Sequence, residues 1–263
     1  MFVPTDMTDM TRIISFANHK GGVGKTTSTH SIGVALGKAG QKVLLIDLDP
    51  QANMTDSAGV TEADNDIYDA LTGKVEDIPI VQLYENVWLT PSSIDLASAE
   101  MELSAEMGRE YILKGLIEPY ADNFDYILID CPPSLGLLTT NALTASTDVF
   151  IPLQAQFLAM KGLDKLIKVV EIIKARLNPD LNISGVIITQ YNSRTSLNRD
   201  VFDYVKQKFP QSAFLTPIRN NVTLAESPSS GSDIFAYDKN SNGAKDYLAL
   251  TEEILARFEP VTV

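Results

Sequence analysis

One short segment of the sequence has the composition of a phosphate-binding loop. It reads Lys20-Gly21-Gly22-Val23-Gly24-Lys25-Thr26-Thr27. In such a loop the glycines let backbone N–H groups curl around phosphate oxygens, while a lysine reaches the β- and γ-phosphates and a threonine hydroxyl ligates Mg²⁺. We therefore expect Lys25 to contact the phosphates, Thr26 to ligate the metal, and the whole run to bind a nucleoside triphosphate.

Carboxylates follow two apolar runs farther along the chain. The first run, LLIDLDPQAN, contains Asp47 and Asp49, and the second, YILIDCPPS, contains Asp130. Because Asp47 and Asp49 are two residues apart, a strand would send both side chains to the same side. A single aspartate at a strand end is as easily a helix cap or a turn former. Three of them after two apolar strands, beside a phosphate loop, favour a functional site.

Alternating strands and helices must position these residues. Short apolar runs alternate with helical patterns, which is typical of βα units and of a mostly parallel, twisted sheet with helices on both faces. The expected strands are residues 12–18, 42–47, 126–130, 148–152 and 183–189. The expected helices are residues 26–39, 93–106, 137–145, 159–177, 197–208 and 244–258. Residues 59–83 have the weakest pattern and are expected to form a peripheral lobe.

Length and composition indicate one cytoplasmic domain. The 263 residues are 44% hydrophobic, and a compact domain can reach roughly 250 residues before it divides, so residues 1–263 are expected to form a single domain. Residues 1–11 do not resemble a signal peptide, and no run approaches the roughly 20 apolar residues of a membrane span. Cys131 is the single cysteine, which excludes an internal disulfide and multi-cysteine metal sites.

Charge is distributed unevenly along the chain. The net charge of −13 argues against a nucleic-acid partner, because phosphates attract lysine and arginine. Residues 161–219, however, hold ten basic and five acidic residues, whereas residues 56–110 hold thirteen acidic and two basic ones. The first segment is therefore a candidate DNA-binding region, and the second could receive a basic segment of a partner protein.

The loop as a whole resembles the deviant Walker A loop of the ParA and MinD group. His19 stands where the general motif has glycine, and Lys20 opens the loop. The resemblance implies a P-loop NTPase of the deviant Walker A class, with ATP and Mg²⁺ as cofactors and ATP hydrolysis as the activity. It also implies that Lys20 reaches across a homodimer that sandwiches the nucleotides, where its charge assists phosphoryl transfer. The alternative is a solvated loop lysine.

The same resemblance assigns further roles. It implies that Asp49 orients the attacking water, that Asp47 lies near the metal, and that Asp130 holds Mg²⁺ through a water. The adenine pocket of the family falls at Gln190 to Asn192 and at Pro217. Other segments that fit ParA-like sequences are residues 138–142, 151–154, 161–163, 226–229 and 243–247.

ParA-like proteins bind DNA without sequence preference, and only as the ATP-bound dimer. Arg194 matches a family position used for this, whereas Arg219 lies displaced within a stretch where the family has two basic residues. On the helix after residue 159, basic side chains lie within about 80° of one another at 100° per residue. They are Lys161, Lys165, Lys168 and Arg176. A stripe of this kind can also be a merely solvated face.

The resemblance implies a partition ATPase of the cytoplasm that associates with the nucleoid. Its ATP-bound dimer would be released from DNA when a ParB-like centromere-binding or activator protein stimulates hydrolysis. One alternative is a ParA-like ATPase that positions a protein cargo. Another is a MinD-like membrane switch, which needs a basic amphipathic C-terminal helix. Residues 252–263 have one arginine and three glutamates, so we expect no membrane partner.

Overall fold

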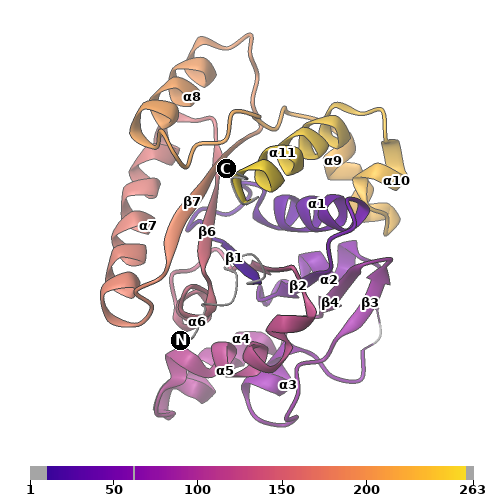
Figure 1. Ribbon diagram of the computed structural model, residues 1–263, viewed down its shortest axis with the longest axis vertical. Helices are drawn as coiled ribbons and strands as arrows, with labels where there is room; N and C mark the ends of the chain where they lie inside the picture. Colours follow the sequence, from indigo (N-terminus) through magenta and orange to yellow (C-terminus); the bar gives the residue numbers. More distant parts are fainter. Residues whose placement is uncertain (1–10, 62, 259–263) are drawn as a thin grey trace, which may run out of the picture.

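The apolar runs of the sequence form one sheet in the computed structural model, which describes residues 11–61 and 63–258 but not the side chains of residues 157–161. Within this part of the chain the sheet has seven strands, in the order β3-β4-β2-β5-β1-β6-β7 (Figure 1). The strands are β1 (Arg12–Phe16), β2 (Val43–Asp47), β3 (Val81–Tyr84), β4 (Val87–Thr90), β5 (Tyr126–Asp130), β6 (Asp148–Gln154) and β7 (Asn182–Thr189). Neighbouring strands are parallel except for β3 and β4, which are antiparallel.

Helices connect the strands and cover both faces of the sheet (Figure 1). The first six are α1 (Lys25–Lys38), α2 (Asn53–Ser57), α3 (Ile67–Leu71), α4 (Leu96–Glu102), α5 (Ile112–Ile117) and α6 (Leu137–Ala145). The others are α7 (Phe157–Arg176), α8 (Ser196–Lys208), α9 (Thr223–Glu226), α10 (Ile234–Asp238) and α11 (Asn242–Phe258). Single 3₁₀ segments lie at Leu103–Ala105, Arg109–Tyr111, Glu118–Asn123 and Ser227–Ser230. The predicted class, a mostly parallel α/β sheet with helices on both faces, is confirmed.

Alternation along the strands divides the core into two halves. Leu44 and Ile46 of β2 belong to a cluster with the buried faces of α3 to α8, whereas Val43 and Leu45 belong to a cluster with α1, α10 and α11. Side chains of successive strand residues point to opposite faces, so a parallel sheet covered on both sides reads as a continuous apolar run. Helix α1 packs closely on this sheet, because a Cβ at Gly33 would overlap the Leu45 side chain.

The region between β2 and β5 differs from expectation. Residues 59–83 are not a separate lobe: α3 buries Ile67 and Leu71 in the main core, and β3 pairs with β4 at the edge of the sheet. The helix expected over residues 93–106 is shorter, since α4 ends at Glu102 and a 3₁₀ turn follows. Elements of four to seven residues are too short to show a helical or strand period, which explains why the sequence did not predict them.

The parallel register brings the loops after six strands, all but β3, to one edge of the sheet. Asp47 at the end of β2 lies opposite Asp130 at the end of β5, and Asp130 lies opposite Phe16 at the end of β1. Ligand sites in open α/β sheets form at the carboxyl ends of the strands. The phosphate-loop candidate and the candidate carboxylates therefore belong to the same site.

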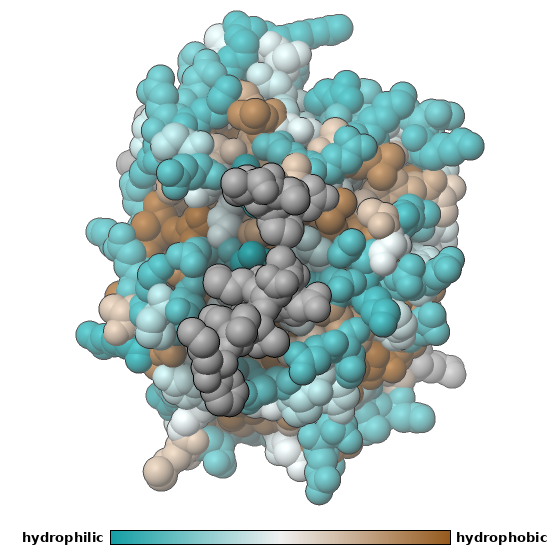
Figure 2. Space-filling model, in the orientation of Figure 1, coloured by the Kyte–Doolittle hydropathy of each residue, from teal (hydrophilic) through white to brown (hydrophobic). Residues whose placement is uncertain are grey.

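Polar side chains dominate the exterior. In the view of Figure 2, hydrophilic residues cover most of the surface that the grey atoms leave visible, and hydrophobic residues form separate small patches. Among the described residues, no helix has the length and apolar character needed to span a bilayer.

Candidate nucleotide site

The loop between β1 and α1 has the backbone of a phosphate cradle. Gly22 and Gly24 adopt positive φ angles of 71° and 85°, a conformation that residues with a Cβ rarely take. Gly24 is the residue before α1, so the loop delivers its backbone N–H groups at a helix N-terminus, where the helix dipole favours an anion. The sequence prediction of a phosphate-binding loop thus has the backbone geometry that it requires.

Lys25 and Thr26 begin α1 at the same place. The Lys25 residue is only 6% exposed, although an ammonium group is rarely buried without a charged partner. Burial raises the pKa of Asp130, and the Thr26 hydroxyl and the Lys25 charge each oppose this rise. Both residues therefore lie close to the carboxylate that ends β5.

Asp47 is fully buried and firmly held. Its Oδ2 accepts hydrogen bonds from the backbone N–H of Thr55 (2.9 Å) and from the Thr55 hydroxyl (2.8 Å). Its Oδ1 accepts one from the backbone N–H of Asp49 (3.2 Å). Burial raises the pKa of Asp47 to about 6, the hydrogen bonds from Thr55 and Asp49 oppose the rise, and the charge of Asp49 adds to it.

Asp130 is equally buried, but both of its carboxylate oxygens lack a hydrogen-bond partner within the described part of the chain. Burial raises the pKa of Asp130 well above its usual range, and the charge of Asp47 adds to this effect. A buried polar group without a partner is costly. The pair Asp47 and Asp130 therefore favours a bound cation.

These donors fit Mg²⁺. Among the described residues, no group of three or more histidine, cysteine, aspartate and glutamate side chains is arranged to hold a metal ion. Mg²⁺ does not need such a cage, because it is commonly bound by one or two protein oxygens together with substrate phosphates and waters. The unpartnered oxygens of Asp130, next to the hydroxyl of Thr26, have this chemistry.

Asp49 lies two residues beyond the end of β2 and is buried. Its Oδ1 accepts a hydrogen bond from the backbone N–H of Gln51 (3.0 Å), and its carbonyl oxygen accepts one from the Ser92 hydroxyl (2.9 Å). Asp49 is thus held through its side chain by Gln51 and through its backbone by Ser92. A carboxylate so placed, near the phosphate loop, can orient a water molecule.

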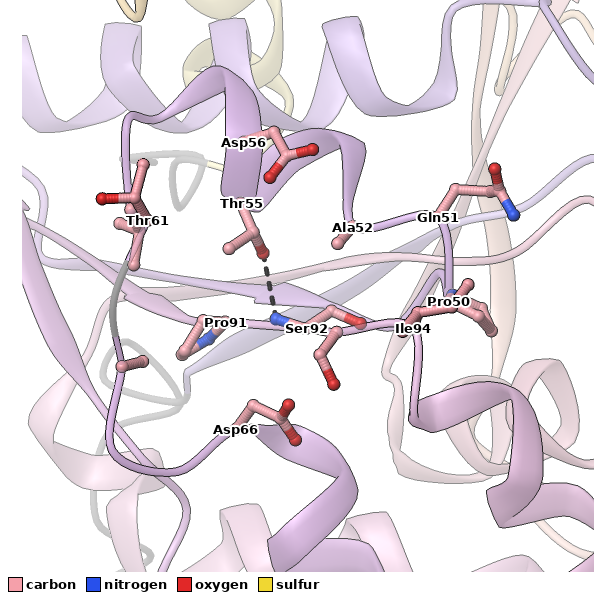
Figure 3. Close-up of a pocket in the computed structure, with 13 residues that line it drawn as sticks. Pro50, Gln51, Ala52, Thr55, Asp56, Thr61, Asp66, Pro91, Ser92 and Ile94 are labelled. Carbon is pink, nitrogen blue, oxygen red and sulfur yellow. Dashed lines mark hydrogen bonds between the residues drawn. The ribbon is translucent and has the colours of Figure 1, made fainter.

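A network that the sequence did not reveal supports these carboxylates. The backbone N–H of Ser92, after β4, donates to the Thr55 hydroxyl at 2.9 Å (Figure 3). The same hydroxyl donates to Asp47. Thr55 and Ser92 line a cavity of about 490 Å³ whose other lining residues include Pro50, Asp56 and Asp66 (Figure 3). Thr55 and Ser92 belong to no sequence motif, and only the fold brings them to Asp47.

The end of β7 adjoins the phosphate loop. The Thr189 hydroxyl donates to the Val23 carbonyl (2.8 Å) and the Gln190 amide to the Gly22 carbonyl (2.7 Å). Gln190 therefore contacts the loop itself. Beside it lies a cavity of about 430 Å³, lined by Tyr191, Asn192, Ser193, Arg194, Arg219, Asn220 and Asn242.

This cavity is the candidate base pocket. Asn192, predicted to line the adenine site, is one of its lining residues. Pro217 is half-buried and is not among the described residues that line it. The segment containing Pro217 nevertheless runs beside β7, because Ile218 donates to the Ile188 carbonyl (2.8 Å) and accepts from the N–H of Tyr191 (2.9 Å).

Lys20, the first residue of the loop, binds its own chain. Its Nζ donates to Oε1 of Gln154 and to Oε1 of Gln156, each at 3.0 Å. It is therefore not a freely solvated lysine. Gln154 ends β6 and Gln156 precedes α7, and no motif in the sequence predicted that either would contact Lys20.

The predicted DNA-contacting residues lie in two places: Arg194 and Arg219 line the candidate base pocket, and Lys165 and Lys168 lie on α7. Lys165 and Lys168 are exposed on α7, and Arg194 is exposed after β7, whereas the side chain of Lys161 lies outside the described residues. Arg219 is not a free cation, because its guanidinium forms an ion pair with Asp246 (Nη2 to Oδ1, 2.6 Å). The sequence could not predict this pairing, since the two residues are 27 positions apart.

Known proteins resemble this chain over most of its length. A family model described as an AAA domain matches residues 11–183. The sporulation initiation inhibitor protein Soj of Bacillus subtilis is 45% identical over 251 residues, which cover 94% of this chain and 99% of that protein. The chromosome-partitioning ATPase Soj of Treponema pallidum is 43% identical over 250 residues, covering 94% and 98%.

A solved structure has the same fold. It is described as cobyrinic acid a,c-diamide synthase from Mycobacterium smegmatis with bound ADP and magnesium. The TM-score is 0.82 with 38% sequence identity, covering 95% of this chain and 96% of that one. The fold is thus shared with proteins whose descriptions name different biological roles.

Proposed function

The chain belongs to the ParA and Soj family of P-loop ATPases, and from that premise we propose that it is a DNA-partition ATPase, which binds DNA as an ATP-bound dimer and leaves it after hydrolysis. The observation that carries the nucleotide part is the buried carboxylate of Asp130, which has no hydrogen-bond partner in the described chain and lies beside Lys25 and Thr26. Such a group fits Mg²⁺.

The nucleotide would occupy the edge of the sheet where these residues meet. Backbone N–H groups of residues 21–27 and the Lys25 ammonium would bind the phosphates, and Thr26, Asp47 and Asp130 would hold Mg²⁺ directly or through water. The magnesium ion would neutralise charge on the phosphates. The base would enter the cavity beside Asn192, with Gln190 and Pro217 near it.

Hydrolysis would depend on Asp49 and on two copies of the chain. Asp49 would orient the attacking water, and Lys20 of each protomer would reach the phosphates of the other, where its charge offsets that which develops in the transition state. Two protomers would therefore close face to face over the nucleotides. Asp49→Ala should leave nucleotide binding in place and slow hydrolysis, which would hold the dimer closed.

DNA binding would use the exposed basic residues Lys165, Lys168 and Arg194. Contacts of this type go to phosphates, so binding would be nearly independent of sequence and strongly dependent on salt. The protein would then reside in the cytoplasm on the nucleoid. A ParB-like or other activator protein would stimulate hydrolysis. Residues 56–110 hold thirteen acidic and two basic residues, and this excess of negative charge suits a basic activator segment.

The description of the Mycobacterium smegmatis structure raises amide synthesis as a second candidate. Taking nitrogen from glutamine with an enzyme thiolate requires a reactive, accessible cysteine. Cys131 is the chain's single cysteine, it is buried, and burial raises its pKa to about 12. A thiol in this state is a poor nucleophile, which favours the partition function.

Retention on DNA tests the proposal. We expect the protein to remain on random-sequence duplex DNA with ATP and Mg²⁺ at low salt, to leave it as salt increases, and not to remain with ADP or without nucleotide. Asp49→Ala should stay bound longer after ATP is diluted. Equal retention with ATP and ADP at low salt would contradict the DNA-binding dimer. Sedimentation with anionic liposomes and ATP tests the alternative of a membrane switch. We expect the protein not to sediment with the liposomes.

A further inference from the structure

Lys20 is held by a directional network of side-chain amides. Its Nζ donates to Oε1 of Gln154 (3.0 Å), the Gln154 amide nitrogen donates to Oε1 of Gln190 (2.5 Å), and the Gln190 amide nitrogen donates to the Gly22 carbonyl (2.7 Å). The amide oxygen of each of these two glutamines thus accepts a hydrogen bond from the preceding group, and its amide nitrogen donates to the next. Hydrogen bonds arranged in series polarise and strengthen one another.

The side-chain amide of Gln156 also accepts a hydrogen bond from the Lys20 ammonium group. Oε1 of Gln156 accepts from Lys20 Nζ at 3.0 Å. Gln156 is exposed, and its backbone N–H donates to the Gln154 carbonyl (2.7 Å), so the two glutamines are fixed relative to each other. An ammonium group has three donors, and two of them are occupied here.

The backbone on both sides of this contact is anchored. The N–H of Lys20 donates to Asn18 Oδ1 (3.1 Å), and the Asn18 amide donates to the Pro152 carbonyl of β6 (2.7 Å). Gln190 has a positive φ of 51°, which is uncommon for a residue with a side chain and is retained only where the surroundings impose it. The position of Lys20 is therefore built into the fold rather than a chance surface contact.

We propose that Gln154 and Gln156 are positioning residues that hold the Lys20 ammonium within its own protomer until a second ATP-bound protomer is in place. This inference rests on the proposed function, in which Lys20 acts on the phosphates of the partner. Closure of the dimer must break both hydrogen bonds in each protomer. The two glutamines therefore oppose dimerisation and set the nucleotide and protein concentration at which it occurs.

The chemistry of the acceptors suits a contact that must be released. Both are neutral amides, and a hydrogen bond from a charged donor to a neutral acceptor is weaker than an ion pair with a carboxylate. Water competes at the exposed Gln156. The phosphates of a bound nucleotide carry full negative charge, so they would attract the ammonium more strongly than either amide does.

Accessibility of Lys20 in the nucleotide-free protein tests the contact without a dimer. An N-hydroxysuccinimide ester would be reacted briefly with wild type and with Gln154→Ala/Gln156→Ala, and labelling at Lys20 quantified by mass spectrometry against the exposed Lys168. We expect the variant to label Lys20 roughly fourfold faster or more, since it loses two hydrogen bonds and each is worth about a factor of two to ten. Equal labelling would overturn the proposal.

The affinity of the dimer tests whether the two glutamines oppose dimerisation. With a non-hydrolysable ATP analogue, Gln154→Ala/Gln156→Ala should lower the dimer dissociation constant roughly tenfold or more, because each dimer otherwise has to break four hydrogen bonds, two in each protomer. Gln156→Glu should raise it, since a carboxylate holds Lys20 more strongly. Both differences should vanish in a Lys20→Ala background. A weaker dimer in the alanine variant, or a difference that persists without Lys20, would overturn the proposal.

If wild type forms no dimer with nucleotide, the proposed function fails, while Lys20 labelling still decides whether the glutamines hold the lysine.

Discussion

The Thr55 hydroxyl donates a 2.8 Å hydrogen bond to Oδ2 of Asp47. The same hydroxyl accepts a hydrogen bond from the backbone N–H of Ser92, so a single side chain joins the buried carboxylate to the loop after β4. Both Thr55 and Asp47 are buried. The relationship predicts that Thr55 fixes the orientation and the charge of Asp47.

Thr55→Val should slow ATP hydrolysis roughly tenfold to a hundredfold while changing nucleotide affinity less, because one hydrogen bond to a charged group is worth about 1.5–3 kcal/mol. Removing the hydroxyl also removes a bond that favours the ionised carboxylate, so the pKa of Asp47 should rise further above its present value of about 6. The acid limb of the activity profile should therefore move to higher pH. Thr55→Ser keeps the hydroxyl and serves as the control; equal profiles for the two variants would refute the role.

Asp130→Asn should stabilise the nucleotide-free protein at pH 7.5, because a neutral amide replaces a fully buried carboxyl group whose ionisation is opposed by burial and whose oxygens have no partner among the described residues. We expect a gain of about 1–3 kcal/mol in the free energy of unfolding. The same variant should gain less stability than wild type from Mg²⁺ with nucleotide, as measured by thermal unfolding. Asp56→Asn, at an exposed acid, should change neither quantity. A variant that kept the full stabilisation by Mg²⁺ would exclude Asp130 as a metal-binding residue.

His30 predicts acid sensitivity of the fold. Burial lowers the pKa of His30 to about 4, against the attraction of Asp233, and its Nε2 has no partner within the described chain. Because the folded pKa lies below the unfolded value of 6.5, its contribution to stability is present above pH 6.5 and is lost as the pH falls toward 4. Relative to His30→Gln, wild type should lose about 3 kcal/mol between pH 7.5 and pH 4.

The comparison with His30→Gln is necessary because Asp47 acts in the opposite direction. Its pKa is raised to about 6, so the folded state takes up protons more readily than the unfolded state below that pH, and acidification relieves its burial. The free energy of unfolding in urea, measured for wild type and His30→Gln at several pH values, separates the contribution of His30 from that of Asp47. A difference between wild type and variant that stays constant with pH would show that His30 does not titrate as expected.

The sequence predicted the parts of the fold that are long or that have an exact local pattern. The strand over residues 126–130 and the helix over residues 137–145 coincide with β5 and α6, since both are apolar runs with clear boundaries. The hairpin of β3 and β4 was missed, because four-residue strands show no period and their pairing is decided by the edge of the sheet.

The candidate site likewise has residues that the sequence could predict and residues that it could not. The phosphate loop and the three aspartates could be found because each lies in a contiguous motif that follows a strand. Thr55, Ser92, Gln154 and Gln156 could not, since they act through contacts made only in the folded chain. The ion pair of Arg219 with Asp246 is of the same kind, and it alters the interpretation of a residue that the sequence offered as a DNA contact.

Lys165 and Arg219 should therefore respond differently to substitution. Lys165→Gln/Lys168→Gln removes two exposed charges from α7 and should weaken retention on duplex DNA without changing the stability of the fold. Each phosphate contact contributes about 0.9 to the slope of log affinity against log salt concentration. We expect the slope to become shallower by about two in the double variant, measured with ATP bound.

Arg219→Ala should act mainly on stability. Asp246 is buried, and its carboxylate accepts from the Arg219 guanidinium and from the Arg219 backbone N–H (2.9 Å). Losing the guanidinium leaves a largely buried carboxylate with fewer partners, which costs about 1–3 kcal/mol. Arg219→Lys is the matched control, because it keeps the charge but cannot bind Asp246 with two nitrogens. If Arg219→Ala unfolded like wild type yet reduced the salt slope by about one unit, the arginine would contact DNA rather than secure α11.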